Sequence, residues 1–356
     1  MFKQYLLACL IHSTFANIFF LKKLFLFVSI SSLLFSCNSD KPKLSIPEVE
    51  EKKISLKIER FEQDVFNTDP NNISGGIALL RKKYGSFFND FAVNILSLAS
   101  ADTIEFNQTF LSFTQDRDMK DVNKLILKKY PDLADLESDL AGAFTYYKHY
   151  YPDSLIPRVV SMNSGFNFAV VTTDTFLAIG LEMYLGDSCQ YYPLLGLPKY
   201  KTKTMTKEFL ATDVIKGWAS TVFEEPANSS SLLSKMIYQG KLLYFLDALY
   251  PETEDAIKIN YSPEQMKWCE ENQSKVWKML VNKKLLFSTQ KEEIVKLVNE
   301  APFTAGLPRE SPGRIGQWLG WQIIRAYMKN HPDVTLQQLM KENDFEKILR
   351  ESKYKP

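Results

Sequence analysis

The chain of 356 residues carries 43 lysine and arginine residues against 42 aspartate and glutamate residues. This near-neutral balance argues against a nucleic-acid partner. Aromatic residues make up 13% of the chain, which is typical of a packed globular protein and argues against an intrinsically disordered one. Residues 1–36 hold three lysines and no acid, so 40 basic and 42 acidic residues remain in the rest of the chain. That remainder is long enough to bury a sizeable core.

The first residues have the parts of a lipoprotein signal. Lys22 and Lys23 precede the charge-free run 24–35, and the segment 34–37 reads Leu-Phe-Ser-Cys. A basic patch, a short apolar stretch and a small residue before the cleavage site are typical of a secretory signal. A cysteine directly after that site is the lipobox arrangement. We therefore predict that Cys37 becomes the new N-terminus and carries a lipid.

Two alternatives remain open for this leader. Residues 1–35 could form a transmembrane helix, although the apolar run after the lysines is shorter than the roughly 20 residues that cross a bilayer. The segment before Lys22 is long for the basic part of a signal. We expect translation to begin near Phe20 or Leu21.

The residues behind the cysteine predict a tether. They are polar, contain Pro42 and Pro47, and end in the charged run 48–53. Segment 38–41 has one acid and no acidic cluster, which favours a protein that faces the periplasm over one exported to the surface. The predicted organisation is a signal peptide over 1–36, a flexible tether over 37–53 after the lipidated Cys37, and a single globular domain over 54–356.

Most of the chain has the apolar spacing of helices. The alternating run 54–58 predicts a strand, and helical spacing follows it. In the middle, β-rich runs flank a turn at 163–165. The predicted strands there are 158–162, 166–171 and 176–181. The predicted helices are 75–84, 87–98, 118–130, 133–150, 203–223, 232–249, 263–283, 290–300, 314–329 and 336–350. This pattern predicts an α+β fold that is predominantly helical, with a small mixed or partly antiparallel sheet in the middle.

The sequence contains no complete catalytic motif. His149 and His331 are the histidines after the leader, and neither has a metal-ligand partner at helical spacing, so we expect both to be structural. His-Glu-x-x-His, Cys-x-x-Cys, P-loop and Gly-x-Ser-x-Gly patterns are absent. We therefore expect no catalytic site, no metal and no cofactor. Cys189 and Cys269 could form a disulfide or stay as two buried thiols.

An unusual glycine pattern opens the predicted helix near residue 314. Gly313, Gly316 and Gly320 share one helical face. Each glycine inside a helix costs about 1 kcal/mol relative to alanine, so we expect another backbone to approach this face closely. Arg314 opposes the helix dipole, and it either serves a partner carboxylate or interface or is a surface arginine. We expect Gly316→Leu to disrupt folding or assembly.

Several of these features occur together in one known family. They are the lipobox Cys37, the segments 58–62, 177–186 and 236–244, and the glycine helix over 312–327. With them the chain resembles the gliding-motility lipoproteins of the GldB family of Bacteroidota. The resemblance implies an envelope lipoprotein that supports gliding and the associated type IX protein secretion machinery. It implies partners among those proteins and no established catalytic activity.

A fainter similarity concerns zinc peptidases of the zincin type, through a strand, a helix and a Gly-Lys-x-x-Tyr-Phe-like segment. That family would carry His-Glu-x-x-His over 203–223, where this chain has Glu208, Asp213 and Trp218. Gln239 stands where a third, carboxylate ligand would be expected. Since zinc needs three or four such ligands, this resemblance implies a zincin-like scaffold that has lost its metal and works in assembly.

Two other functions remain open at this point. The chain could be a divergent hydrolase whose carboxylates the sequence does not identify. It could also be a surface ligand-binding lipoprotein, in which the aromatic segment 149–151 and Tyr191 and Tyr192 line a sugar site.

Overall fold

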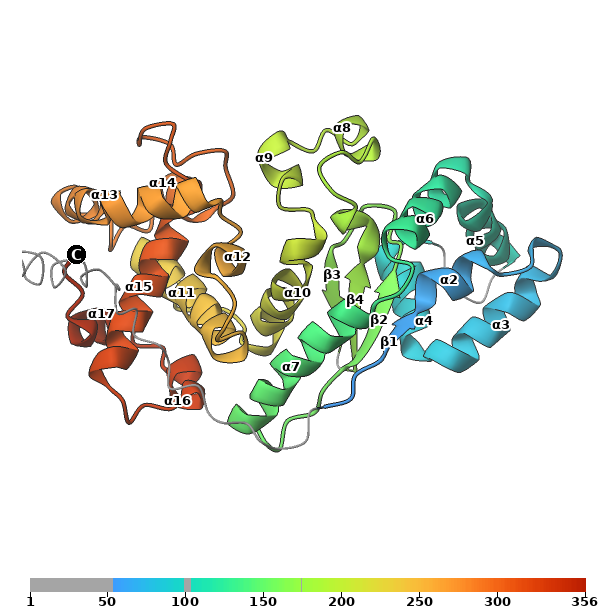
Figure 1. The fold of residues 1–356 in the computed structure, drawn as a ribbon, viewed down its shortest axis with the longest axis horizontal. Coiled ribbons are helices and arrows are strands. Elements are labelled where there is room, and N and C mark those ends of the chain that lie inside the picture. The colour runs from blue at the N-terminus through green and yellow to red at the C-terminus, as the bar shows by residue number, and fades with distance from the viewer. Residues whose placement is uncertain (1–53, 99–103, 174) are drawn as a thin grey trace, which may run out of the picture. The chain divides into compact units, whose positions relative to one another are not determined.

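The computed structural model describes residues 54–98, 104–173 and 175–356, which belong to one compact unit. The predicted leader, Cys37 and the predicted tether over 37–53 lie outside these residues. Within the described part helices predominate, and one small sheet lies among them (Figure 1). The α+β prediction is therefore confirmed.

The sheet is mixed. Its strands are β1 (Ile58–Arg60), β2 (Arg158–Met162), β3 (Val170–Thr172) and β4 (Phe176–Gly180). They lie in the order β1-β2-β4-β3, with β1 and β4 both parallel to β2 and with β3 antiparallel to β4. The carboxyl ends of the three parallel strands consequently meet at one edge of the sheet.

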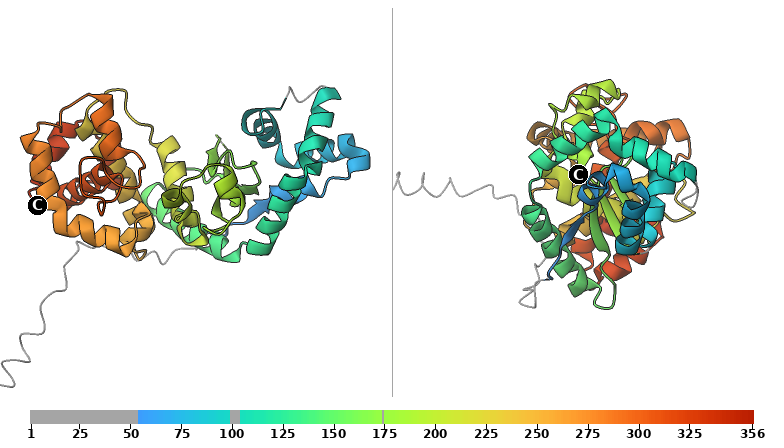
Figure 2. Two further views of the ribbon diagram at one scale, coloured as in Figure 1. Left: turned by 90° about the horizontal axis from the view of Figure 1, so that it is seen from above. Right: turned by 90° about the vertical axis from the view of Figure 1, so that its right-hand side faces the viewer.

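Both faces of the sheet are buried, and the alternation of side chains divides the interior into two cores. Val159 and Leu177 face the larger core, which includes residues of α7 (Ala134–Tyr150), α10 (Lys207–Val222) and α11 (Leu232–Leu249). Val160 and Phe176 face the smaller core, which contains many phenylalanines. Figure 2, in the view from above, shows α2–α5 on one side of the sheet and α11–α17 on the other.

The smaller core is built around Phe61. Its ring lies edge-on to Tyr84 and Phe91, with centroids 4.7 Å away in both pairs. The helices that supply this core are α2 (Phe61–Phe66), α3 (Ile73–Tyr84), α4 (Ser86–Asp90), the π-helix η2 (Phe91–Ile95) and α5 (Ile104–Gln115). The predicted helix over 87–98 is thus an α-helical turn that continues as a π-helix, with Leu96 N bonded to Phe91 O at 2.9 Å.

The other elements complete the larger core and the connections. No described helix combines the length and the apolar character that crossing a membrane requires. The remaining bounds are η1 (Pro70–Asn72), α6 (Arg117–Lys129), η3 (Leu181–Tyr184), α8 (Tyr191–Leu194), α9 (Lys199–Thr202), α12 (Asp255–Ile259), α13 (Pro263–Asn282), α14 (Lys291–Val298), α15 (Ile315–Asn330), α16 (Leu336–Lys341) and α17 (Phe345–Ser352).

Three further predicted elements differ from the structure. The helix predicted over 336–350 is broken between α16 and α17, because Asp344 caps α17 and the buried Lys241 ammonium binds the carbonyl of Glu342. The strand predicted over 166–171 begins only at Val170, since Phe166 has a φ of +66°. The strand predicted over 54–58 is β1, which starts at Ile58.

The central contact of the larger core joins α11 to α15. A Cβ atom on Gly320 would lie 1.8 Å from the carbonyl oxygen of Met236, and one on Gly240 would lie 2.4 Å from the carbonyl carbon of Gly320. The two backbones therefore touch, and only glycine fits at their crossing. Gly316, one turn earlier on α15, lies mainly against α14, because its Cβ would lie 2.9 Å from the carbonyl oxygen of Leu297 and 3.2 Å from Met236 Cγ on α11.

A buried ionic network lies beside this crossing. Asp247 on α11 accepts from Arg325 at 2.7 and 2.8 Å, from Trp321 Nε1 at 2.8 Å and from Lys258 Nζ at 2.9 Å. Arg325 also binds Asp255 at 2.7 and 2.9 Å, and its guanidinium lies 3.8 Å from the Trp321 ring centroid. Two carboxylates and two cations thus neutralise one another and connect α11, α12 and α15.

The crossing predicts a large difference between two glycine substitutions. Gly320→Ala should lower the free energy of unfolding by at least about 2 kcal/mol, because the new methyl group meets backbone that has no room to move. Gly142→Ala on α7 meets no atom within 4 Å and should raise it by up to about 1 kcal/mol. Urea unfolding of both variants measures this, and equal stabilities would contradict the proposed close packing.

Candidate functional site

The glycine helix begins with an arginine in an unusual conformation. Arg314 is the N-cap of α15 and has a φ of +60°. Its guanidinium donates to the carbonyls of Ile259 and Asn260 at 3.0 and 3.3 Å and lies 5.4 Å from the Tyr261 ring centroid. Only 13% of its side chain is exposed, with Glu300 4.0 Å away. Arg314 is therefore engaged within the chain and is not a solvated surface arginine.

The loop that Arg314 holds carries a second left-handed residue. Asn260 ends α12 with a φ of +57°, and its Nδ2 donates to Asp213 Oδ1 on α10 at 2.7 Å. Tyr184 donates its hydroxyl to the other oxygen of Asp213 at 3.2 Å. Burial raises the pKa of Asp213, and these donors together with nearby Lys216 and Arg314 partly oppose that shift.

Lys216 follows Asp213 by one helical turn. Its ammonium donates to Gln317 Oε1 over a long 3.4 Å, and Gln317 Nε2 donates to the carbonyl of Val298 at 2.8 Å. Burial lowers the pKa of Lys216 to about 8, and the charge of Arg314 acts in the same direction. We name Asp213, Lys216, Asn260, Arg314 and Gln317 the α10–α15 polar cluster.

The chemistry available to this cluster is proton exchange or anion binding. A lysine with a pKa near 8 is partly neutral in mildly alkaline solution, and perturbed groups of this kind gather at functional sites. Asp213 is already occupied by two donors. In the part of the chain that the structure describes, no group of three or more histidines, cysteines or acids is placed to hold a metal ion.

A second perturbed carboxyl lies at the carboxyl edge of the sheet. Glu182 Oε1 accepts from Ser164 N at 2.8 Å, from the Ser164 hydroxyl and from Phe166 N at 3.3 Å. Its Oε2 has no hydrogen-bond partner, and neither does the buried Nδ2 of Asn163. Burial raises the pKa of Glu182 to about 7, against the effect of these donors. Its visible role is to fix the loop over 163–168.

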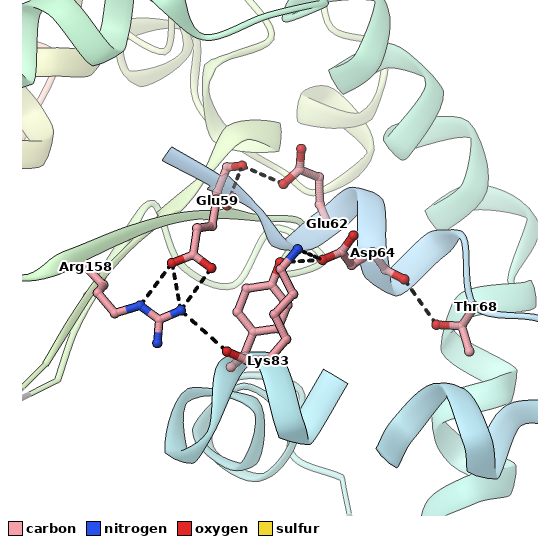
Figure 3. Close-up of polar contacts among 8 residues, drawn as sticks. Glu59, Glu62, Asp64, Thr68, Lys83 and Arg158 are labelled. Atoms are coloured by element: carbon pink, nitrogen blue, oxygen red, sulfur yellow. Dashed lines mark hydrogen bonds and ion pairs between the residues drawn. The ribbon is translucent and has the colours of Figure 1, made fainter. Parts of the chain in front are cut away.

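Segment 58–62, which contributes to the family resemblance, forms contacts that hold the fold together. Glu62 accepts from Arg60 Nε at 2.5 Å and from the Ser161 hydroxyl at 2.6 Å, which joins α2 to β2. Figure 3 shows Arg158 facing Glu59. The Nη2 and Nε atoms of Arg158 donate to Glu59 Oε1 at 2.7 and 3.0 Å, respectively. This second pair is partly exposed, so it contributes at most about 1 kcal/mol.

The structure separates several residues that the sequence grouped. Tyr151 stacks on Tyr147 and meets Phe245, whereas Tyr192 is fully buried and donates to the carbonyl of Glu182. Tyr192 therefore lies in the interior, whereas Tyr151 and Tyr191 are half-buried and His149 is exposed. Cys189 and Cys269 are free buried thiols.

The histidines have internal contacts as well. His331 Nδ1 lies 2.9 Å from the carbonyl of Tyr327, and the two rings stack with centroids 4.5 Å apart. His149 lies edge-on to Tyr150, with centroids 5.1 Å apart.

The predicted glycine face is confirmed for Gly316 and Gly320, which lie on α15 and are buried. It is wrong for Gly313, because α15 begins at Ile315 and the left-handed Arg314 separates Gly313 from the helix. Gly313, Gly316 and Gly320 approach Ala301, Leu297 and Met236, respectively. Sequence reasoning missed Lys216, Gln317 and Glu182. A lysine within the apolar pattern of α10, and a glutamate directly after the apolar run of β4, were the available signals.

The zincin interpretation receives no support from these positions. Of the three α10 residues that it singled out, Asp213 belongs to the polar cluster, Glu208 is exposed, and Trp218 packs on Phe144 and Tyr147 with centroids 5.2 and 4.8 Å away. Gln239 on α11 is only partly buried.

Comparison with known proteins gives one result. A family model described as gliding motility protein GldB matches residues 43–356, which is most of the chain. No curated protein and no solved structure matches.

Lys216 predicts a specific dependence of stability on pH. Its folded pKa of about 8 lies below the ordinary 10.5, so stability rises as pH increases from 8 to 10.5, by up to about 3 kcal/mol. The Lys216→Met variant should have a higher free energy of unfolding than the wild-type chain at pH 7, because it buries no charge. It should also lack the contribution of Lys216 to the increase in stability between pH 8 and 10.5. Lys241, whose pKa burial also lowers to about 8, supplies a similar rise that the variant keeps. Urea unfolding across this range measures both, and an unchanged profile would refute the assignment.

Glu182 predicts the opposite slope at lower pH. Its folded pKa of about 7 lies above the ordinary 4.5, so the folded state binds more protons and stability falls as pH rises from 4.5 to 7. The fall should be at most about 3 kcal/mol. Glu182→Gln keeps an oxygen acceptor for Ser164 and should flatten this part of the profile. Thermal unfolding at matched pH values is the measurement, and a steeper profile in the variant would oppose the prediction.

Proposed function

Because the chain belongs to the GldB family of gliding motility proteins, we propose that it is a non-catalytic, lipid-anchored component of the cell envelope. In this proposal it supports gliding and the associated type IX protein secretion machinery as an assembly or interaction protein. The family match over residues 43–356 is the observation that carries the proposal.

The leader supports the lipid anchor. The segment 34–37 ends in Cys37, behind a basic patch and a short apolar run. One acyl chain binds a membrane only marginally, whereas two or three hold it firmly. The diacylglyceryl group expected on Cys37 would therefore keep the domain at the membrane, and we place it on the periplasmic side.

The buried acids support a non-catalytic role. Among the described residues, the buried carboxylates are Glu62, Glu182 and Asp247, and each accepts hydrogen bonds from a neighbouring element of the fold. Asp213 likewise accepts from Asn260 and Tyr184. Glu182 keeps one oxygen without a partner, but each of these acids holds a loop or a helix in place, which favours a protein that presents surfaces over one that moves protons.

One observation favours a second function, that of a divergent hydrolase. Lys216 has a lowered pKa and a single long hydrogen bond, so its amine could act as a base. This alternative requires Lys216 itself. The assembly role requires only that the fold remains intact.

Complementation of a deletion strain separates these functions. We expect deletion to abolish gliding and type IX secretion, and the wild-type chain to restore both. Lys216→Met should restore them as well, because it keeps the packing of α10. Cys37→Ala should fail, since it removes the lipid attachment site. Gliding on agar and secretion of a reporter protein are measured, with immunoblots to match the amounts of protein.

The other outcomes are equally informative. Failure of a folded Lys216→Met protein would favour the hydrolase. A deletion strain that glides and secretes normally would refute the proposed role. Protease treatment of intact cells tests the orientation, because a periplasmic domain should survive it.

A further inference from the structure

The segment between η3 and α10 exposes apolar side chains at its outer end. We name residues 193–203 the α8–α9 tip (Figure 1). Leu194 is 79% exposed and Leu195 is 50% exposed, and Tyr200 on α9 adds a ring that is 36% exposed. Two adjacent leucines held in water lose the free energy that their burial would provide, so such a patch points to a partner surface.

The tip is held in this exposed position by contacts beneath it. The Tyr192 hydroxyl donates to the carbonyl of Glu182 and accepts from Leu185 N, both at 2.9 Å. Thr202 donates to Asp187 at 2.5 Å. Cys189, Tyr192 and Met205 form a small buried cluster of their own under the tip. The leucines are therefore presented by a packed platform.

The chain around these leucines is strongly basic. Residues 188–207 contain Lys199, Lys201, Lys203 and Lys207 and no acid, whereas the whole chain is close to neutral. Lys199 and Lys203 are exposed. Lys201 lies 3.8 Å from Glu300, and Lys207 lies 2.7 Å from Asp135. Positive charge therefore accompanies the exposed leucines on one short segment.

We propose that the α8–α9 tip docks on the surface of an anionic lipid bilayer. Leucines that enter the boundary between head groups and acyl chains, with lysines that contact lipid phosphates, are the combination that interfacial segments use. Each lysine near an anionic surface increases binding about fivefold. A lipid on Cys37 would raise the effective concentration of bilayer at the tip. The docking proposal rests on the proposed function only through this lipid anchor. It does not require that the protein act in gliding or secretion.

A fluorescent probe at the tip tests this docking. The full lipidated chain, with Leu194→Cys labelled by a maleimide dye, is reconstituted into vesicles that contain nitroxide-labelled lipid. Cys189 and Cys269 are buried, and the unsubstituted chain gives the labelling background. The matched control is Leu79→Cys on α3, where the native leucine is 69% exposed. Vesicles of phosphatidylcholine are compared with vesicles in which a third of the lipid is phosphatidylglycerol.

We expect strong quenching at position 194 in the anionic vesicles and weak quenching at position 79. Reversing the charge at Lys199 and Lys203 (K199E/K203E) should lower the ratio of docked to undocked protein by well over tenfold. The same change at the exposed Lys82 and Lys128 (K82E/K128E) should leave it unchanged.

Equal quenching at positions 194 and 79, or equal quenching in both kinds of vesicle, would overturn the proposal. So would a photoreactive group at position 194 that crosslinks in cells to an acidic protein and not to lipid. Complementation is read separately, so a failure of docking is distinguishable from a failure of the motility role.

Discussion

The contact between the backbones of α11 and α15 is the constraint on which the larger core depends. Because Gly240 and Gly320 have no Cβ, the two helices approach until their main chains touch. This approach places Trp321 and Arg325 against Asp247, and through Arg325 it fixes Asp255 on α12. Arg314, at the start of the same helix, then meets the loop that ends α12.

The charged side chains in the interior connect the helices of the larger core. Asp247 and Arg325 are buried as partners, and Asp213 and Lys216 are held by groups from α12 and α15. Since these groups are largely occupied by one another, recognition of partners falls to the surface and to the predicted lipid anchor. The α8–α9 tip combines exposed leucines with the exposed Lys199 and Lys203, as a membrane-facing element requires.

The apolar spacing predicted the starts of several helices closely. Ser231 and Ser262 form capping boxes, and α11 and α13 begin directly after them, close to the predicted bounds. The prediction missed α5 entirely. It also fused α16 with α17, because the break depends on Lys241 from a distant helix. Short strands were placed within a few residues, but their parallel pairing is a property of the tertiary fold.

The sequence by itself predicted the lipobox at Cys37, and it determined the predominance of helices, the small sheet and the glycine face of α15 formed by Gly316 and Gly320, since these follow from local pattern and spacing. Only the tertiary structure decided which backbone that face contacts. It also showed that Arg314, which the sequence left open as a surface residue, binds the carbonyls of Ile259 and Asn260 within the fold. It also decided which acids are perturbed, because the pKa of Glu182 and the pKa of Lys216 depend on burial by residues far away in the chain. Burial and long-range pairing are set by all elements together, so no local window of sequence contains them.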